Sequence, residues 1–277
     1  MNDIFKLKPH RYNKTFFGSL KGGFKFYARK LYLFKNYKTF EKIVNKFPSS
    51  RAFFARNEKS SNDILHRKYG CNAFSYQYGY ECLENTIKVI LNKFENIFEK
   101  SYLLCTLNDE FTVYMRSGSR MLNEGVFTIY IRYQNECFFD MNFIITKEND
   151  FMITCLQGYT NTSDMVKIFT KEFFGLRPVS FFINFAYKFK DYLQLNKLLG
   201  VDDKYLVSGF KRGKFRKNRE YIINDYNMFW DENCDIIAKH KGYFEIVPSR
   251  KNIDEIPSKK RSMYKKRFDF LDNLQLI

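Results

Sequence analysis

Two acids and a tyrosine surround an aromatic pair in the C-terminal third of the chain. The polar residues are Asp225, Tyr226 and Glu232, and the aromatic pair is Phe229 and Trp230. A carboxylate held against an aromatic, partly desolvated wall has a raised pKa and can transfer protons. The three polar residues are therefore candidate catalytic groups. The alternative is an amphipathic helix with the aromatic pair in the core and the acids in water, which is the usual role of aromatic residues at helical spacing.

The stretch from 151 to 178 has the pattern of a strand, a polar loop and a helix. Residues 151–156 are apolar, residues 159–163 carry helix-capping side chains, and Gly175 and Pro178 end the helix. The N-terminus of such a helix presents unpaired backbone N–H groups to an anion. The residues around that point are Gln157, Gly158, Thr162 and Ser163. An ordinary strand–turn–helix unit, which is common in α/β folds, is the alternative.

Basic residues form further candidate anion-binding sites. Arg177 places a planar guanidinium fork before Pro178, where it can hold a carboxylate or phosphate or tie the loop to the preceding helix. A basic cluster near the C-terminus suits phosphates or anionic lipid, and a solvated basic helix is the alternative. Its members are Lys259, Lys260, Arg261, Lys265, Lys266 and Arg267. The stretches 1–35 and 211–219 are also rich in Lys and Arg.

The net charge of +17 implies attraction to polyanions, but it does not choose among nucleic acid, anionic lipid and phosphorylated small molecules. Specific recognition of nucleic acid is not expected, because the chain has no RNP signature, zinc finger or clear helix-turn-helix. The motifs GxSxG, GxxxxGK[ST] and HExxH are also missing, which argues against simple hydrolase, P-loop and zincin chemistry.

The six cysteines are scattered without a CxxC pair and only three histidines are present, so no structural metal is expected. Cys105, Cys137 and Cys155 lie in apolar strand-like runs and are expected to be small buried groups in a reducing compartment. No signal-peptide core is evident, and no stretch reaches the ~18 apolar residues that span a bilayer. The expected location is the cytoplasm, with peripheral contact with the inner membrane as an option.

The spacing of apolar residues changes near residue 105. Before this point it is helical, over 39–68 and 84–100. From residue 111 it alternates, which predicts an antiparallel meander. The predicted strands are 111–115, 126–133, 137–146, 151–156, 204–210 and 242–248, and the later helices are 163–174, 179–199, 225–232 and a closing helix in the tail. The predicted fold class is α+β, a mixed α/β arrangement, with a helical N-terminal region (1–105) packed on an antiparallel-rich sheet with helices (106–277).

A series of motifs resembles the VirK/YbjX family of bacterial proteins. The motifs are LNEGVFTIYI (122–131), CLQG (155–158), TKEFFGLRP (170–178), LGVDD (199–203), DYNMFWDE (225–232), GYFEIVP (242–248) and IPSKKRSMYKKR (256–267), with HRKY (66–69) as a weaker match. The resemblance implies a bacterial protein linked to virulence and to envelope traits such as tolerance of antimicrobial peptides, with no established reaction. The family usually has His before the Gly of GLRP, and Phe174 stands there in this chain, so a histidine base at that place is absent.

The predicted order of meander, loop, two helices and a further strand is also similar to that of N-acyltransferase folds. In those folds a coenzyme A pyrophosphate sits on the N-terminus of the helix after the central strand. The likeness implies that Gln157, Gly158, Thr162 and Ser163 face a phosphorylated cofactor here, although the Gly-rich signature of that loop is missing. Two functions are therefore predicted. The first is an acyltransferase-like enzyme that uses coenzyme A (CoA) or acyl-CoA on an envelope precursor or protein. The second is a non-enzymatic accessory protein that binds an anionic membrane or a protein partner through basic surfaces.

Overall fold

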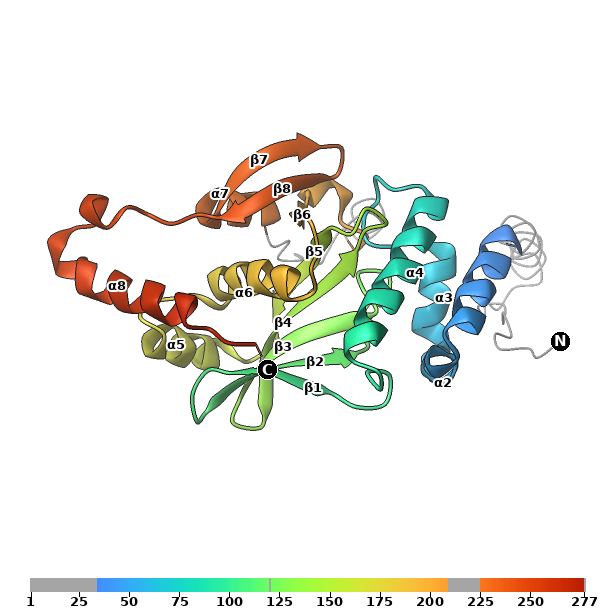
Figure 1. Ribbon diagram of the computed structural model, residues 1–277, viewed down its shortest axis with the longest axis horizontal. Coiled ribbons are helices and arrows are strands. Elements are labelled where there is room, and N and C mark those ends of the chain that lie inside the picture. The colour runs from blue at the N-terminus through green and yellow to red at the C-terminus, as the bar shows by residue number, and fades with distance from the viewer. Residues whose placement is uncertain (1–33, 120, 209–224, 277) are drawn as a thin grey trace, which may run out of the picture.

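The computed structural model describes residues 34–119, 121–208 and 225–276, and one eight-stranded sheet organises this part of the chain (Figure 1). The strand order is β1-β2-β3-β4-β5-β6-β8-β7, and every neighbouring pair in it is antiparallel except β5 and β6. The strands are β1 Tyr102–Thr106, β2 Phe111–Ser117, β3 Phe127–Tyr133, β4 Glu136–Ile145, β5 Phe151–Gly158, β6 Leu198–Val201, β7 Cys234–His240 and β8 Tyr243–Pro248. The predicted α+β class is confirmed. The basic stretches 1–33 and 211–219 lie outside the described residues.

Helices precede the sheet and connect its later strands. Residues 34–46 are helical, and the further helices are α2 Pro48–Arg56, α3 Glu58–His66, α4 Tyr76–Lys93, α5 Ser163–Glu172, α6 Pro178–Tyr192, α7 Tyr226–Asn233 and α8 Ser258–Asp272. Local chemistry sets several of their starts. The Ser75 hydroxyl accepts from the Tyr78 N–H at the start of α4, and Pro178 occupies the first position of α6. Two short 3₁₀ turns, Asp203–Tyr205 and Ile253–Glu255, complete the described structure.

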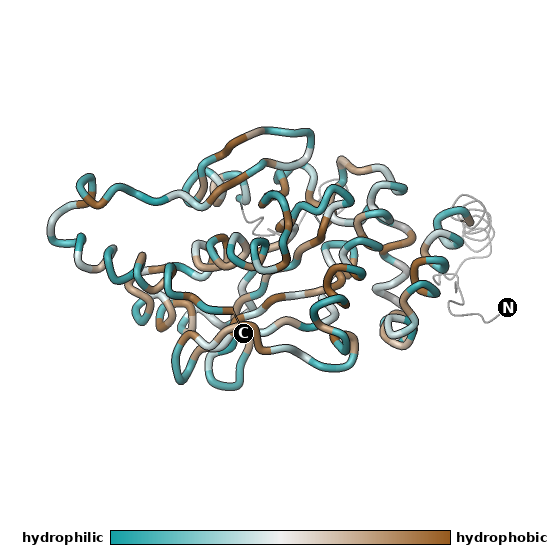
Figure 2. The backbone as a smooth tube through the Cα atoms, in the orientation of Figure 1, coloured by the Kyte–Doolittle hydropathy of each residue, from teal (hydrophilic) through white to brown (hydrophobic). Residues whose placement is uncertain are grey.

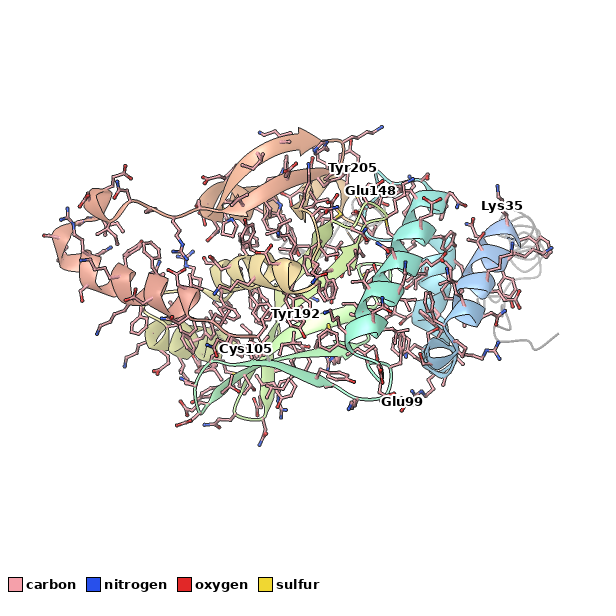
Figure 3. The ribbon with its side chains drawn as sticks, viewed as in Figure 1. Lys35, Glu99, Cys105, Glu148, Tyr192 and Tyr205 are labelled. Atoms are coloured by element: carbon pink, nitrogen blue, oxygen red, sulfur yellow. The ribbon has the colours of Figure 1, made fainter. Side chains whose placement is uncertain are left out.

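The apolar face of the sheet is packed against α5 and α6, and aromatic side chains dominate the contact. Phe111 of β2 meets Phe169 of α5 at 5.4 Å between ring centroids, and Phe143 of β4 meets Phe189 of α6 at 6.3 Å. Figure 2 shows hydrophobic residues concentrated in the central strands and hydrophilic ones at the outer loops. Side chains fill the space between α6 and the strands, and Tyr192 at the end of α6 packs against Phe94 just after α4 (Figure 3). The abundant phenylalanines are therefore largely core residues.

The second half of the chain departs from the sequence-based prediction in three places. The helix predicted over 179–199 ends at Tyr192, and Leu198–Val201 form β6, where Gly200 lies under Trp230 rather than capping a helix. The strand predicted from residue 204 begins as a 3₁₀ turn, and β7 was not predicted. A four-residue strand that is buried on both faces has no alternation, so its apolar residues could not be distinguished from the end of a helix.

Candidate active site

One face of the central sheet is polar although it is largely buried. Strand register aligns two rows of side chains across β2, β3, β4 and β5. The first row is Arg116, Thr128, Asn142 and Cys155, and the second row is Tyr114, Tyr130, Asp140 and Gln157. The opposite face carries Met115, Ile129, Met141 and Leu156 in the equivalent places. Buried polar groups are costly unless they are hydrogen-bonded, and several of them share this face, so we take it as the candidate functional site.

The loop between β2 and β3 adds a carboxylate, Glu124, to the first row. Gly125 lets this loop approach β4, since a Cβ atom there would lie 2.5 Å from the Phe143 carbonyl oxygen. The Thr154 hydroxyl donates to the carbonyl of Glu124 itself. The loop therefore fixes the Glu124 carboxylate over the sheet, where only 4% of the residue is exposed.

Hydrogen bonds connect Glu124 to the first row. The Asn142 amide donates to the Glu124 carboxylate at 3.4 Å, and the Thr128 hydroxyl donates to the Asn142 carbonyl oxygen at 2.7 Å. Burial raises the pKa of Glu124, and the neighbouring charge of Asp140 raises it further. A buried carboxyl group whose pKa is moved toward neutrality is suited to proton transfer.

Asp140, in the second row, lies between this buried region and the surface. It is 3% exposed and hydrogen-bonds to Tyr159, whose hydroxyl accepts from Arg116 at 3.2 Å. Burial raises the pKa of Tyr159, and the Asp140 carboxylate contributes to the increase. Tyr159, Arg116 and Gln157 are half-buried. These residues form a polar path from the solvent to the two buried carboxylates.

Cys155 lies at the end of the first row, between the acids and α7. Its thiol is a hydrogen-bonding neighbour of both the Glu124 carboxylate and the Tyr226 hydroxyl. Burial raises the pKa of the Cys155 thiol well above its ordinary value, and the charges of Glu124 and Asp140 add to this. The Cys155 thiol is therefore harder to ionise than an exposed cysteine thiol, and it lies beside the carboxyl group of Glu124.

β5 and β6 diverge beside these residues. The two strands pair only over Phe151–Ile153 and Leu198–Gly200, so the later residues of β5, 154–158, have no strand partner on that side. We call the place where the strands diverge the β5–β6 fork. On the β5 side, the Tyr226 hydroxyl accepts from the Leu156 N–H at 2.9 Å and donates to the Leu156 carbonyl at 3.1 Å. On the β6 side, the Trp230 indole N–H donates to the Val201 carbonyl at 2.9 Å. Helix α7 thus holds both sides of the fork.

The residues predicted to be catalytic are not brought together. Tyr226 is buried in the fork, and burial raises its pKa well above the ordinary value, so the phenol stays neutral. Asp225 is exposed and caps α7, where its carboxylate accepts from the Met228 N–H at 2.9 Å. Glu232 is exposed on the same helix and has no hydrogen bond or ion pair with any residue that the structure describes.

The predicted cofactor-binding residues lie together at the end of β5 and the start of α5. Gln157 is half-buried at the end of the second row, and Gly158 and Ser163 are exposed. Thr162 directs its hydroxyl back to the carbonyls of Tyr159 (2.7 Å) and Phe138 (3.2 Å), so no side chain caps α5. The first N–H groups of α5 therefore face outward without a side-chain acceptor.

The groups around the start of α5 fit a phosphorylated ligand. The uncapped N–H groups and the Ser163 hydroxyl are donors, and Arg116 is bonded to Tyr159 of the same loop. Asp164 carries a negative charge in the first turn of α5, but Lys167 pairs with it at 2.8 Å and lowers its pKa. The hydrogen-bond donors at the start of α5 therefore outnumber its one acid, Asp164, whose charge is balanced by Lys167.

The predicted anion-binding residues differ in their surroundings. Arg177 is exposed at the start of α6, and Lys259 and Lys260 are exposed in the first turn of α8. Arg261 instead turns toward its own chain, where it donates to the carbonyls of Ile256 and Asp254, both at 2.8 Å. Three of these four side chains are thus directed toward solvent, whereas Arg261 holds the start of α8.

Metal ligation and membrane spanning have no support in the part of the chain that the structure describes. No group of three or more His, Cys, Asp or Glu side chains within it could hold a metal ion. No helix within the same residues is both long enough and apolar enough to cross a bilayer. All six cysteines are free thiols.

Sequence reasoning missed the acids of the buried network, Glu124 and Asp140. Asp140 and Asn142 alternate with apolar neighbours in a predicted strand, which is also the pattern of a strand with one solvated face. Glu124 lies in a motif that the family resemblance used, but nothing in its spacing places it over a strand. The available signal was the recurrence of polar residues at alternate positions in three consecutive strands.

Comparisons with known proteins place this chain in a family. A family model described as "Protein of unknown function (DUF535)" matches residues 16–276. This chain belongs to the DUF535 family. Its relatives include an uncharacterized protein of Haemophilus influenzae that is 34% identical over 157 residues (55% of this chain and 52% of that protein). A second one from the same organism is 32% identical over 172 residues, which are 61% of this chain and 56% of that protein.

A third DUF535 relative confirms the resemblance to the VirK/YbjX family. The uncharacterized protein YbjX of Escherichia coli is 31% identical over 107 residues, which are 38% of this chain and 32% of YbjX. The chain spans about half the length of the two Haemophilus influenzae relatives (52% and 56%). No solved structure matches this DUF535 chain. The comparisons therefore establish the family, whose function is unknown.

Proposed function

We propose that this protein is an acyltransferase-like enzyme that takes an acyl group from a CoA-type thioester. The observation that carries the proposal is the pair of buried carboxylates, Glu124 and Asp140, beside β5, whose end leads directly into the uncapped start of α5. Free helix N–H groups at the end of a strand offer a place for the phosphorylated end of a ligand. The order of meander, loop, two helices and parallel strand also supports the proposal, by its likeness to N-acyltransferase folds.

In this proposal the start of α5 binds the phosphates. Ser163 and the first N–H groups of α5 act as donors, Gln157 and Gly158 line the approach, and Thr162 keeps the loop in shape through its bond to the Tyr159 carbonyl. The cofactor would supply the acyl group as an activated thioester. The protein's own contribution is to orient that thioester along the end of β5 and to exclude water from it.

Asp140 is the proposed proton acceptor for the group that receives the acyl chain. It is buried, hydrogen-bonded to Tyr159 and close to the half-buried rim formed by Gln157 and Arg116. A proton taken up by Asp140 can return to solvent along this path. Tyr226 is assigned a positioning role, because its hydroxyl is engaged by both backbone groups of Leu156.

The acceptor is proposed to be an envelope precursor or envelope protein, acylated from the cytoplasmic side. This part rests on the resemblance to the VirK/YbjX family, which implies a link to virulence and to tolerance of antimicrobial peptides. It does not depend on the geometry of the site, so the two parts of the proposal can be tested separately.

Calorimetric titration with CoA, acetyl-CoA and a long-chain acyl-CoA tests the proposal, with tripolyphosphate as a polyanion control. We expect binding of the CoA species that tripolyphosphate does not reproduce, and a higher melting temperature, because a ligand that binds only the folded state stabilises it by ~2.7 kcal/mol at 100 times its Kd.

Two variants locate the site. Ser163→Glu should weaken CoA binding by about tenfold or more, because it puts a second acid in the first turn of α5. Ser262→Glu, at another exposed serine, on α8, is the matched control and should bind as the wild type does. Asp140→Asn should retain binding and lose acyl transfer. Equal binding of every polyanion, or equal effects of the two serine variants, would refute the proposal.

A second candidate function is that of a non-enzymatic accessory protein on an anionic membrane. The observation that favours it is the exposure of Lys259, Lys260, Lys265 and Lys266 on α8, where no residue that the structure describes forms an ion pair with them. Lysines in the first turn of a helix are disfavoured by the helix dipole, so their presence there suggests an external anionic partner. This function predicts vesicle binding that falls with salt, whatever the outcome with CoA.

A further inference from the structure

Cys155 places a thiol, a potential nucleophile, on the buried polar face. The proposed function described above gives this thiol no role. Cys155 follows the point where β5 and β6 separate, so it lies beside the β5–β6 fork rather than beneath a paired strand. Its register partner on β4 is Asn142, which donates to the Glu124 carboxylate. Thr154, the residue before it, is the extra residue of a bulge against β4. Bulges re-aim side chains and are enriched beside active sites.

The surroundings of Cys155 combine a nucleophile with a base. The thiol meets the carboxylate of Glu124, and Glu124 is itself held by the Asn142 amide and by the Thr154 hydroxyl, which bonds to its carbonyl. On its other side the thiol meets the hydroxyl of Tyr226. A nucleophile within reach of a base that a third group orients is the arrangement used in covalent catalysis.

The other cysteines have different surroundings. The Cys71 thiol donates to the carbonyl of Gly242 at 3.4 Å, and the Cys105 thiol approaches the Thr106 carbonyl at 3.7 Å. Burial is the main cause of the raised pKa values of Cys82 and Cys234. Among the described residues, a carboxylate in hydrogen-bonding contact with a thiol is found at Cys155.

We propose that Cys155 is a catalytic residue that carries the acyl group as a covalent thioester, an inference that rests on the proposed function. The Cys155 sulfur attacks the carbonyl carbon of the acyl-CoA thioester while the thiol proton passes to Glu124. A new bond forms between this sulfur and the acyl carbon, the bond to the CoA sulfur breaks, and CoA leaves as a thiol with the proton from Glu124.

The second half of the cycle returns the enzyme to its starting state. The acceptor's amine or hydroxyl attacks the acyl-Cys155 carbonyl and gives its proton to Asp140. The bond between the acyl carbon and the Cys155 sulfur breaks. The sulfur then regains one proton, the proton that Asp140 took from the acceptor. The reaction transfers one acyl group and involves no oxidation or reduction. Exchange between two thioesters is close to balanced in energy, so the intermediate can form and react onward.

Mass spectrometry of the full chain after incubation with acetyl-CoA, without an acceptor, tests this inference. We expect the mass of one acetyl group, located on Cys155 by peptide mapping and released by neutral hydroxylamine, which cleaves thioesters. Glu124→Gln should slow labelling about 100-fold, the lower range for loss of a general base. It should also remove the pH dependence of labelling that the carboxyl group confers. Cys137→Ala, at the half-buried thiol on β4, is the control and should label normally.

The outcomes separate this inference from the proposed function. If calorimetry shows CoA binding and the wild type acylates an acceptor but carries no label on Cys155, the covalent step is wrong and direct transfer stands. If CoA does not bind, both the proposed acyltransferase function and the covalent step at Cys155 are wrong. Cys155→Ser and Cys155→Ala should each retain CoA binding and lose transfer, and full transfer by either folded variant overturns the inference. Mapping on the wild type gives an answer even if both variants fail to fold.

Discussion

Replacing Tyr226 with Phe tests how α7 holds β5 at the β5–β6 fork. The variant keeps the ring, which is 6.1 Å from Trp230, and removes only the hydroxyl that bonds to the N–H and the carbonyl of Leu156. Each buried backbone group that loses its hydrogen bond costs about 1–3 kcal/mol. Because the fork can relax or admit water, we expect a total loss of about 2–4 kcal/mol in the free energy of unfolding. At about 2–4 °C per kcal/mol for a chain of this size class, the melting temperature should fall by roughly 4–16 °C.

Urea denaturation followed by tryptophan fluorescence is the appropriate assay, because Trp230 is the chain's one tryptophan and lies in the same helix. Tyr192→Phe is the matched control, since it removes a hydroxyl from a 37% exposed tyrosine and should change stability by less than about 0.5 kcal/mol. If the two variants differ by less than this amount, the Tyr226 hydroxyl does not hold the fork. If Tyr226→Phe keeps full stability but abolishes acyl transfer, the residue is catalytic after all.

Three further perturbations examine the packing, the buried acid and the basic surface. Gly200→Ala should lower the free energy of unfolding by about 1–3 kcal/mol and shift the tryptophan emission, because the new Cβ atom would lie 2.6 Å from the Trp230 ring. An unchanged urea midpoint would show that β6 is not packed under this ring. Glu124→Gln should gain stability relative to the wild type as the pH rises above about 4.5. Burial raises the pKa of Glu124 in the native state above its ordinary value of 4.5, so the native state binds this proton more tightly than the unfolded chain and wild-type stability falls as the pH rises. Chemical denaturation at several pH values measures the gain in free energy of unfolding of the variant over the wild type, and a gain that stays constant or shrinks with pH would contradict this. The double substitution Lys259→Glu and Lys260→Glu should abolish salt-sensitive binding to vesicles of phosphatidylglycerol and leave CoA binding unchanged. Undiminished vesicle binding in a sedimentation assay would exclude this end of α8 as the membrane contact.

The regular part of the fold was accessible from the sequence because its pattern was local. Alternation over 126–133 and 137–146 predicted β3 and β4, since one face of each strand is apolar and packs on α5 and α6. The helix at 225–232 and the strand at 242–248 were also predicted. β7 was missed because Ile237 is an extra residue in a bulge against β8, which interrupts the alternation, and its side chain is 59% exposed.

The candidate site was harder to predict because it depends on register. Sequence reasoning placed the contiguous residues Gln157 to Ser163 between a strand and a helix, because that order is a local signal, but the side chain expected to cap the helix does not cap α5. The alignment of Asn142 with Cys155 depends on a bulge in β5 that no sequence rule locates. Glu124 reaches the same point from a loop that is fixed by one glycine and one hydroxyl. Tyr226 was singled out for its chemistry, but its hydrogen bonds give it a role in positioning.

The buried acids distinguish a site selected for function from one selected for stability. Two carboxylates, Glu124 and Asp140, share one face of the sheet, and each is at most 4% exposed. Taking such groups out of water costs several kcal/mol, and their mutual repulsion adds to the cost, so an apolar face would give a more stable protein. If the acids are retained for chemistry, Glu124→Gln and Asp140→Asn should keep or increase stability at neutral pH while acyl transfer is lost, which is the trade-off expected of an active site. If both variants instead lose stability and unfold cooperatively at lower urea concentration, the acids are structural, and the search for a reaction should move to another surface.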